Sequence, residues 1–482
     1  MNTAAPQSGR VTNFGANQVF QPQAAYAPAS EEELLQILDA NRGKRFRVIG
    51  RLHSWSAAAV AEEVLIDLRK LDATLVHAEQ ETPYAEIGAG CQIKRVLAEL
   101  QSQGGYTLCS LGLITEQAIA GAFSTGTHGS GRPSTSHFVL GVRLAHFDEA
   151  IGKAVIREIT EGDELRAARC SLGSLGVITR ARVAIRKQYM IEEHIRRYKT
   201  LEETLAKEEE FELQQFFLMP WTWDFFGQHR RMVDAPRSKL AWLYRLYWSV
   251  GMDVGLHLNI WPLAKLLPGG CTKFFFRYVA PFTVPGGWRV VDRSDRQLTI
   301  RHELFRHIEI ELFVVRSKLS KALQFVTWFL KRMGGETATP PSDAAEHFAK
   351  SDFLERVEKA AGAYVHHYPI CIRKVFPDDA LISMSSSDGE PRYAISFISY
   401  VWPSQRDGFF RMSELLAEGL ATLYGARAHW GKHCPKGHQA MPSLYPRFRD
   451  FDAVRRRLDP NGAFLNVWAR GLFEAAPKES ED

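Results

Sequence analysis

The stretch VIGRLHSWSA, residues 48–57, has the pattern of a strand that ends abruptly in a turn. Valine and isoleucine favour an extended strand, and Gly50 marks the point where the chain can change direction. His53 follows directly, between Leu52 and Ser54. Such a histidine can be a packed turn residue, a proton carrier, a metal ligand or a point of covalent attachment. A metal role has no partner ligands at a suitable spacing.

The bulk composition narrows the class of protein. The chain has 482 residues, of which 45% are hydrophobic and 24% charged, so we expect two or three globular domains. A net charge of +5 spread over this length does not indicate a nucleic-acid-binding surface. The six cysteines form no C-x-x-C pair, and the polar N-terminus lacks an apolar signal core. We therefore expect a cytoplasmic protein.

One aromatic stretch, LAWLYRLYWSVGMDVGLHLNIWPLAKLLP at 240–268, is a candidate for membrane contact. Arg245 and Asp253 interrupt it, so the stretch is not expected to span a bilayer. A buried helix pair in a second domain is the favoured interpretation. Contact with a membrane surface remains an alternative, because the stretch is rich in aromatic residues.

Strand and helix patterns alternate in the first part of the chain and change character near residue 190. Ser30 and Glu33 predict the capped start of a helix that ends near Asn41, and QIKRVLAELQSQGG predicts a second helix that closes at Gly104 and Gly105. Beyond 190, aromatic residues are denser and a longer amphipathic helix is predicted over 317–335. Strands are predicted over 45–50, 64–68, 73–79, 84–90, 307–315, 365–375 and 392–402.

The glycine-rich stretch SLGLITEQAIAGAFSTGTHGSGRPSTSH, residues 110–137, can bring backbone N–H groups close to an anion. It contains neither the P-loop pattern nor the three-glycine dinucleotide fingerprint. Taken alone, it is as compatible with a structural loop as with a phosphate-binding loop.

Several motifs occur together and point to one family. They are GRLHS at 50–54, STGTHGSG at 124–131, SLGSLGVIT at 171–179, HWGKH at 429–433 and LDPNGAFLN at 458–466. With them the chain resembles the FAD-linked oxidases of the vanillyl-alcohol oxidase type, and within these the aldonolactone oxidases and alditol oxidase. The resemblance implies an α+β fold with a PCMH-type FAD-binding domain at 17–190. It also implies a substrate or cap domain of antiparallel sheet and helices at 191–439, and a C-terminal segment, 440–482, that returns to the FAD domain.

The resemblance also implies an FAD site. In this family the histidine of the G-x-x-H-S motif is bonded covalently to the flavin, so His53 is expected to carry FAD. Gly112 is expected near the flavin face where dioxygen arrives, and a glycine there favours an oxidase over a dehydrogenase. The residues that match the family's cofactor site are Val48, Ile49, Gly50, Arg51, Leu52, His53, Ser54, Ser110, Leu111, Gly112, Thr115, Ala120, Gly121, Ser124, Gly126, Thr127, His128, Gly129, Val177 and Ile178.

On the substrate side, the HWGK motif implies that Lys432 stabilises negative charge on the flavin and that His429 lies close to flavin or substrate. Arg373 matches the arginine of the family's E-x-R pair, but Cys371 stands where the glutamate is expected. Glu311 is predicted to supply the missing acid, with Glu309 on the same strand face.

Two structural alternatives stay open for these residues. Glu309, Glu311 and Arg373 could be plain ion-pair partners. His429 and His433 have the spacing of a metal-binding pair, but Gly431 disfavours a helix there and no third ligand is evident, so we expect no metal.

The expected function is oxidation of a CH–OH group of a sugar-derived alcohol or aldonolactone by hydride transfer to flavin N5, with dioxygen or another acceptor reoxidising the cofactor. One alternative is a bulkier or lipid-linked sugar bound at a membrane surface, which the aromatic residues of 216–285 suggest. Another is a flavin-binding partner protein without turnover, suggested by the loss of the acid at Cys371.

Overall fold

A short hairpin and a small parallel sheet form the first part of the molecule. The computed structural model describes residues 9–284, 286–300, 305–387, 389–435 and 441–474 of 482. Within them, β3 (Ala24–Tyr26), β5 (Val64–Asp67) and β4 (Phe46–Ile49) form a parallel sheet in that order, after a short hairpin of β1 (Val11–Thr12) and β2 (Val19–Phe20). Helix α1 (Glu31–Ala40) connects β3 to β4 and starts as predicted, because the Ser30 hydroxyl accepts the Glu33 N–H at 3.2 Å.

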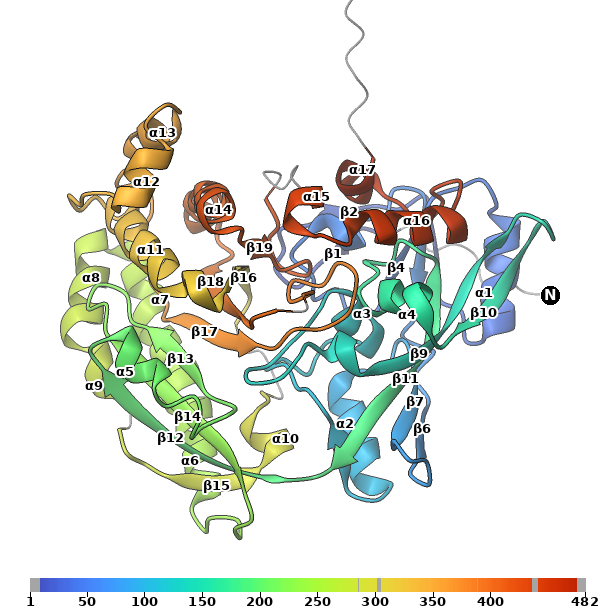
Figure 1. Ribbon diagram of the computed structural model, residues 1–482, viewed down its shortest axis with the longest axis horizontal. Coiled ribbons are helices and arrows are strands. Elements are labelled where there is room, and N and C mark those ends of the chain that lie inside the picture. The colour runs from blue at the N-terminus through green and yellow to red at the C-terminus, as the bar shows by residue number, and fades with distance from the viewer. Residues whose placement is uncertain (1–8, 285, 301–304, 388, 436–440, 475–482) are drawn as a thin grey trace, which may run out of the picture.

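A six-stranded antiparallel sheet continues this half of the molecule (Figure 1). Its order is β10 (Lys153–Ile159), β9 (Val139–Asp148), β11 (Val177–Lys187), β7 (Tyr84–Gly88) and β6 (Thr74–His77), with β8 (Tyr106–Leu108) paired to β11. The helices of this half are α2 (Ile93–Ser102), α3 (Ile119–Ser124) and α4 (Gly162–Arg169). Their apolar faces pack with the strands into one core.

The second half is built on an eight-stranded antiparallel sheet. Its order is β15 (Val290–Arg293), β12 (Met190–Tyr198), β14 (Phe225–Val233), β13 (Gln215–Leu218), β17 (Ile370–Val375), β18 (Arg392–Tyr400), β16 (His307–Val315) and β19 (Arg427–Ala428). Two long helices, α11 (Leu319–Met333) and α14 (Pro403–Tyr424), share a core with this sheet. The shorter helices are α5 (Leu201–Leu205), α10 (Ser294–Gln297), α12 (Ser342–His347) and α13 (Phe353–Lys359).

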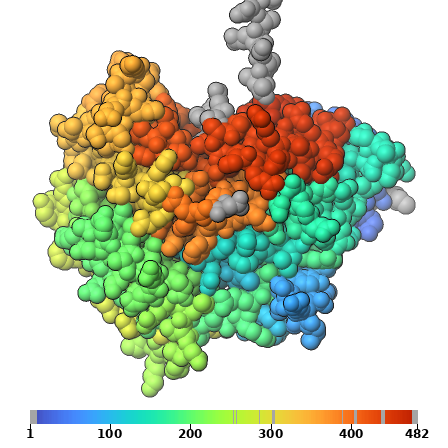
Figure 2. All heavy atoms as spheres, viewed as in Figure 1, coloured from blue at the N-terminus to red at the C-terminus, as the bar shows by residue number. Residues whose placement is uncertain are grey.

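The last helices return to the first half of the molecule. These helices are α15 (Met441–Leu444), α16 (Phe448–Leu458) and α17 (Val467–Phe473), and Phe448, Phe451 and Phe464 are buried in the same core as β9 and β11. Figure 2 shows this red C-terminal part lying against the cyan residues of the first half. The chain passes from one sheet to the other between Lys187 and Met190. We propose an FAD-binding domain at 17–190, a substrate or cap domain at 191–439 and a returning C-terminal segment at 440–482.

Two predictions about local structure need correction. The strand predicted over 365–375 begins only at Ile370, because Pro369 has no N–H to donate to a neighbouring strand. The aromatic stretch 240–268 is helical but is not a buried helix pair. Trp242 is 55% exposed and Leu258 67% exposed, because these helices are apolar on more than one face and their neighbours leave part of that surface uncovered.

The aromatic stretch forms α6 (Ala241–Leu246), a π-helical segment, η3 (Tyr247–Gly255), and α7 (Leu256–Leu266). Two further helices follow, α8 (Gly269–Tyr278) and α9 (Ala280–Thr283). Among the described residues, no helix has the length and apolar character needed to cross a membrane.

Arg427 ties β19 to the C-terminal return. Its buried guanidinium donates hydrogen bonds to the carbonyls of Leu444 (2.7 Å), Ser386 (2.9 Å) and Met384 (3.2 Å). It also lies over the Tyr445 ring, 4.5 Å from the centroid. One side chain therefore joins three segments beside the HWGK motif.

We predict that Arg427→Met lowers the apparent melting temperature of the flavin-loaded protein by about 3–6 °C, because buried carbonyls lose charged donors. Differential scanning fluorimetry measures the shift. Arg95→Met is the control, since the Arg95 side chain is exposed and forms a surface ion pair with Asp72, so it should shift the temperature by less than about 2 °C. Equal shifts in the two variants would contradict the prediction.

Candidate active site

The turn after β4 presents His53 to a cavity. Leu52 has a left-handed backbone with φ +56°, which is unusual for a residue with a side chain. The turn is held on both sides, because the Phe14 N–H donates to Leu52 O at 2.9 Å and the Trp55 N–H donates to Gly431 O at 2.8 Å. The His53 ring stacks on Phe14 at 5.0 Å. A strained, well-supported turn of this kind is typical of functional sites.

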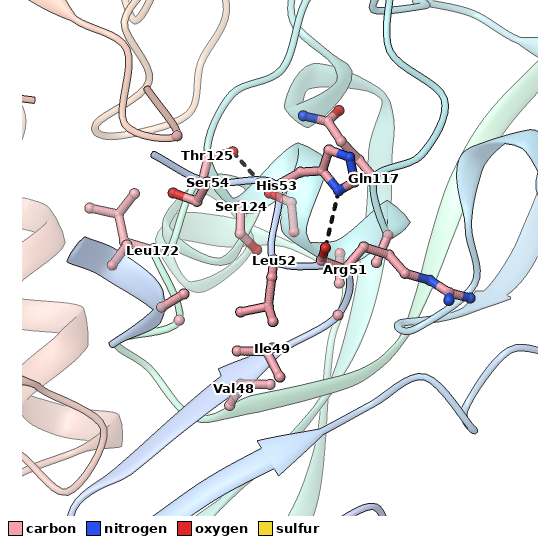
Figure 3. A pocket seen from close by; sticks show the side chains of 18 of the residues that line it. Val48, Ile49, Arg51, Leu52, His53, Ser54, Gln117, Ser124, Thr125 and Leu172 are labelled. Carbon is pink, nitrogen blue, oxygen red and sulfur yellow. Dashed lines mark hydrogen bonds between the residues drawn. The ribbon is translucent and has the colours of Figure 1, made fainter. Parts of the chain in front are cut away.

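The His53 ring has a defined orientation. Nδ1 lies 3.1 Å from the Arg51 carbonyl oxygen, as the dashed line in Figure 3 shows. A carbonyl only accepts, so Nδ1 carries the proton in the neutral ring and Nε2 carries the lone pair.

This first cavity has a volume of about 140 Å³ and suits a diphosphate. Arg47 and Arg51 line it, and their Nε atoms are buried without a hydrogen-bond partner among the described residues. The terminal nitrogens of Arg47 already donate to backbone carbonyls, so only its Nε is left to donate. Burial lowers the pKa of Arg47 to about 10, which leaves it charged at neutral pH. The backbone N–H groups of Arg51, Leu52 and Ser54 also donate to no other described residue. These donors fit the pyrophosphate of FAD.

The residues predicted to bind the cofactor lie in three neighbouring cavities, except for three that line none of them. The turn residues Val48 to Ser54 line the first cavity, together with Ala120, Gly121, Ser124 and Ile178. A second cavity is lined by Gly112, Thr127 and His128, and a small neighbouring one by Ser110, Leu111 and Gly129. Thr115, Gly126 and Val177 line none of the three cavities. Thr115 donates to Ile300 O, Gly126 packs near Met384, and Val177 lies in the core.

Sequence reasoning missed some residues of the first cavity. Gly173 and Gly176 line it and belong to the SLGSLGVIT motif, so the motif could have indicated them. Arg47 and Gln117 also line it, but neither stands in a recognisable pattern.

The second cavity has a volume of about 200 Å³ and meets the first at Gln117, His429 and Lys432, which line both. One part of its wall is polar and includes Glu309, Glu311 and Arg373. The apolar part of the wall consists of Leu113, Ile114, Ile300, Phe305 and Ile398, while His257 and Tyr368 add aromatic surface. The cavity therefore suits a molecule with one polar end and an apolar body.

Glu309 and Lys432 form a buried ion pair at the junction of the cavities. Lys432 Nζ contacts Glu309 Oε2, and Ser396 donates its hydroxyl to Glu309 Oε1. Burial opposes ionisation of Glu309, but Lys432 and His307 hold its pKa well below the usual range. Lys432 Nζ also lies 4.3 Å from the centroid of the Trp55 ring. A fixed positive charge thus stands where both cavities meet.

Glu311 places a carboxylate beside Arg373, in the row of residues that contains Cys371. Glu311 pairs with Ser396 across β16 and β18, and Ser396 pairs with Cys371 across β18 and β17, so the three lie in one row. Glu311 Oε1 lies 3.4 Å from Arg373 Nη1. Glu311 stands two strands away from Cys371 along this row and contacts the arginine. Burial keeps the Cys371 thiol neutral by raising its pKa.

His128 and His429 complete the surroundings of Glu311. His128 Nδ1 lies 2.9 Å from Gly129 O and its Nε2 lies 3.4 Å from Glu311 Oε2, so both nitrogens face acceptors. Burial raises the pKa of Glu311, but the charge and hydrogen bond of His128 lower it more, to about 2. Glu311 is therefore a carboxylate at neutral pH.

The histidines and Glu311 also have a spacing that suits a metal ion, with ligand atoms within 4.8 Å of one another. Sequence reasoning missed this grouping, because it joins three distant segments. His429 Nδ1 accepts the Gly431 N–H at 2.9 Å, so the neutral ring carries its proton on Nε2. Metal-bound histidines instead donate from the second nitrogen. The hydrogen bonds thus favour a carboxylate surrounded by donors over a metal site.

Gly112 has a packing role that the sequence did not reveal. A Cβ atom at this position would lie 2.6 Å from Thr127 Cγ2 and 3.4 Å from His128 O. A side chain at this position would require Thr127 to shift. The preference for an oxidase over a dehydrogenase that this glycine suggests stays a prediction.

Comparison with known proteins agrees with this geometry. Residues 22–151 match the FAD binding domain family, and residues 263–472 match the D-arabinono-1,4-lactone oxidase family. A long-chain alcohol oxidase from an uncultured marine euryarchaeote is 48% identical over 97% of this chain and 98% of its own length. An L-gulono-1,4-lactone dehydrogenase from Mycobacterium tuberculosis is 26% identical over 96% of this chain and 98% of its own.

The fold also matches a solved structure. Cholesterol oxidase from B. sterolicum superposes with a TM-score of 0.70 at 14% identity, over 96% of each chain. This confirms the expected α+β architecture, in which an FAD-binding part is joined to an antiparallel sheet with helices. The chain therefore belongs to the FAD-dependent oxidases of the vanillyl-alcohol oxidase type, related to the aldonolactone oxidases, and is an oxidoreductase of CH–OH donors.

Proposed function

We propose that the protein oxidises long-chain primary alcohols to aldehydes, with covalently attached FAD and with dioxygen as the electron acceptor. The observation that carries the proposal is the second cavity, in which apolar walls adjoin the Glu311–Arg373 pair. The 48% identical relative, named as a long-chain alcohol oxidase, supports the same substrate class.

The cavity distinguishes an alkyl chain from a polyol. Each methylene group that leaves water for the surface of Leu113, Ile114 or Ile398 contributes about 0.8 kcal/mol. A sugar-derived alcohol would bring several hydroxyls against the same side chains, and each unpaired hydroxyl costs about 1–3 kcal/mol. The apolar walls therefore favour the long-chain alcohol over the sugar alcohol or aldonolactone expected from the sequence.

Different side chains act on the alcohol oxygen and on the flavin. When bound, FAD accepts the hydride of the carbinol carbon at N5. Arg373 donates to the alcohol oxygen and stabilises the negative charge that develops there, and Glu311 fixes the guanidinium by accepting from it. The hydroxyl proton leaves the alcohol oxygen as the hydride is transferred. It is released to water and is not kept by Glu311, because the pKa of Glu311 is about 2.

Lys432 acts on the flavin, at the place where the first and second cavities meet. Its ammonium group lies between the two cavities, paired with Glu309. There it offsets negative charge that arises in the first cavity during hydride transfer. These intact charged groups also argue against a flavin-binding protein without turnover.

The cofactor is proposed to be attached through His53 Nε2. The support is the tautomer imposed by Arg51 O and the position of the ring in the wall of the first cavity. Permanent attachment retains FAD and makes it more oxidising, which suits alcohol oxidation. The cytoplasmic location expected from the sequence remains a prediction.

The substrate class is tested by kcat/KM for primary alcohols from butanol to dodecanol, beside xylitol and L-gulono-1,4-lactone. We expect a rise of about three- to fourfold per added methylene while the chain still fits the cavity, and poor turnover of the polyol and the lactone. Hydrogen peroxide formed with each aldehyde would identify dioxygen as the acceptor. A higher kcat/KM for the lactone than for dodecanol would overturn the proposed substrate.

Covalent attachment is tested by acid precipitation of the purified yellow protein. The flavin absorbance should stay in the pellet, whereas His53→Ala should release it to the supernatant. His137→Ala is the matched control, because this histidine lies on the surface and lines neither main cavity. Release of flavin from the unmodified protein would contradict a covalent bond.

A further inference from the structure

Exposed apolar side chains are concentrated in one helical segment. Of the 18 large apolar side chains that are exposed in the described part of the chain, 13 lie between residues 240 and 282. Phe282 is 82% exposed and Leu266 is 66% exposed. These residues belong to α6 through α9 and the short connections between them. Figure 1 shows α8 and α9 at the outer edge of the molecule, beside the eight-stranded sheet. Such a large apolar surface marks an interaction site.

The same segment forms part of the substrate cavity. His257, on α7, lines the cavity, and its Nδ1 lies 2.7 Å from the Tyr368 hydroxyl and 3.0 Å from the Tyr400 hydroxyl. The next residue, Leu258, is 67% exposed on the outside. A single helix therefore separates the cavity from the apolar surface. An apolar molecule held at this surface would lie within one helix diameter of the cavity.

The segment is also the basic part of the chain. Residues 237–289 carry seven lysines and arginines against one acid, Asp253, a net charge of +6. The whole chain carries +5, so all other residues together carry −1. Asp292, Glu336 and Glu192 pair with five of these cations, which still leaves a positive excess. Lys265 lies 4.8 Å from the ring centroid of Trp261.

We infer that α6 to α9, with the lysines and arginines around them, dock the protein on the surface of an anionic lipid bilayer, from which a long-chain alcohol passes directly into the second cavity. The inference rests on the proposed function for its substrate. Apolar side chains that enter the lipid boundary and cations that meet anionic headgroups are the two contributions that bind a protein to a membrane surface. A second copy of the chain fits this surface less well, because two like-charged segments repel.

Docking is tested with the flavin-loaded protein and vesicles of phosphatidylcholine, with and without phosphatidylglycerol, in a sedimentation assay. We expect binding to the anionic vesicles that weakens as salt is added. The double variant Leu266→Glu/Phe282→Glu should lose at least about tenfold in vesicle binding. The matched double variant Leu75→Glu/Ile151→Glu alters side chains that are 56% and 62% exposed in the other half of the molecule and should bind like the unmodified protein.

Measuring the turnover of soluble and vesicle-bound alcohols distinguishes a loss of membrane docking from a loss of catalysis. Both double variants should oxidise soluble octanol at the unmodified rate, and only Leu266→Glu/Phe282→Glu should lose activity on hexadecanol carried in anionic vesicles. Absence of vesicle binding by the unmodified protein would overturn the docking inference and leave the proposed function standing if octanol is oxidised. Vesicle binding without oxidation of either alcohol would refute the proposed function but not docking. A dimer by light scattering that dissociates in Leu266→Glu/Phe282→Glu would assign the surface to a second copy and also overturn the inference.

Discussion

Two buried carboxylates on one strand, Glu309 and Glu311, impose the constraint on which the rest of the site depends. Both are almost inaccessible to solvent, at 4% and 1% exposure. An isolated charge at such a position would be very unfavourable, so each carboxylate must be compensated by nearby cations and donors. Lys432 compensates Glu309, while His128 and Arg373 compensate Glu311. The partners come from the glycine-rich stretch, from β17 and from the HWGK motif, so the charges gather three distant segments around one strand.

This arrangement couples the cofactor side to the substrate side. Lys432 and His429 line both cavities, whereas Arg373 lines the substrate cavity. The Trp55 N–H bonds to Gly431 O, which fixes the turn that carries His53 to the segment that carries Lys432. A change in the position of β16 would therefore alter the cofactor turn and the substrate wall together. The carboxylate that contacts Arg373 stands on β16, in one row of the sheet with Cys371 of β17.

Much of the fold could be predicted from the sequence. The strand over 307–315 matches β16 at both ends, and Ser30 caps α1 as its pattern indicates. Prediction works for these elements because strand propensity, the alternation of apolar and polar residues and helix capping each depend on a few neighbouring residues. The contacts between Glu311, His128 and His429 could not be predicted, because they depend on the register of strands that lie far apart in the sequence. The exposure of Trp242 and Leu258 was missed for a related reason, since composition does not say which faces of an apolar helix find a partner.

Arg373, fixed by buried Glu311, is proposed to stabilise the charge that develops on the alcohol oxygen. Anaerobic stopped-flow reduction of the flavin by dodecanol measures this effect, because it isolates the reductive step from reoxidation. Arg373→Met should slow flavin bleaching by about 10²–10³-fold at unchanged FAD content. Arg132→Met, at an arginine that lines only the neighbouring small cavity, should leave the rate constant within about threefold. An unchanged rate constant in Arg373→Met would show that the arginine does not stabilise charge on the alcohol oxygen.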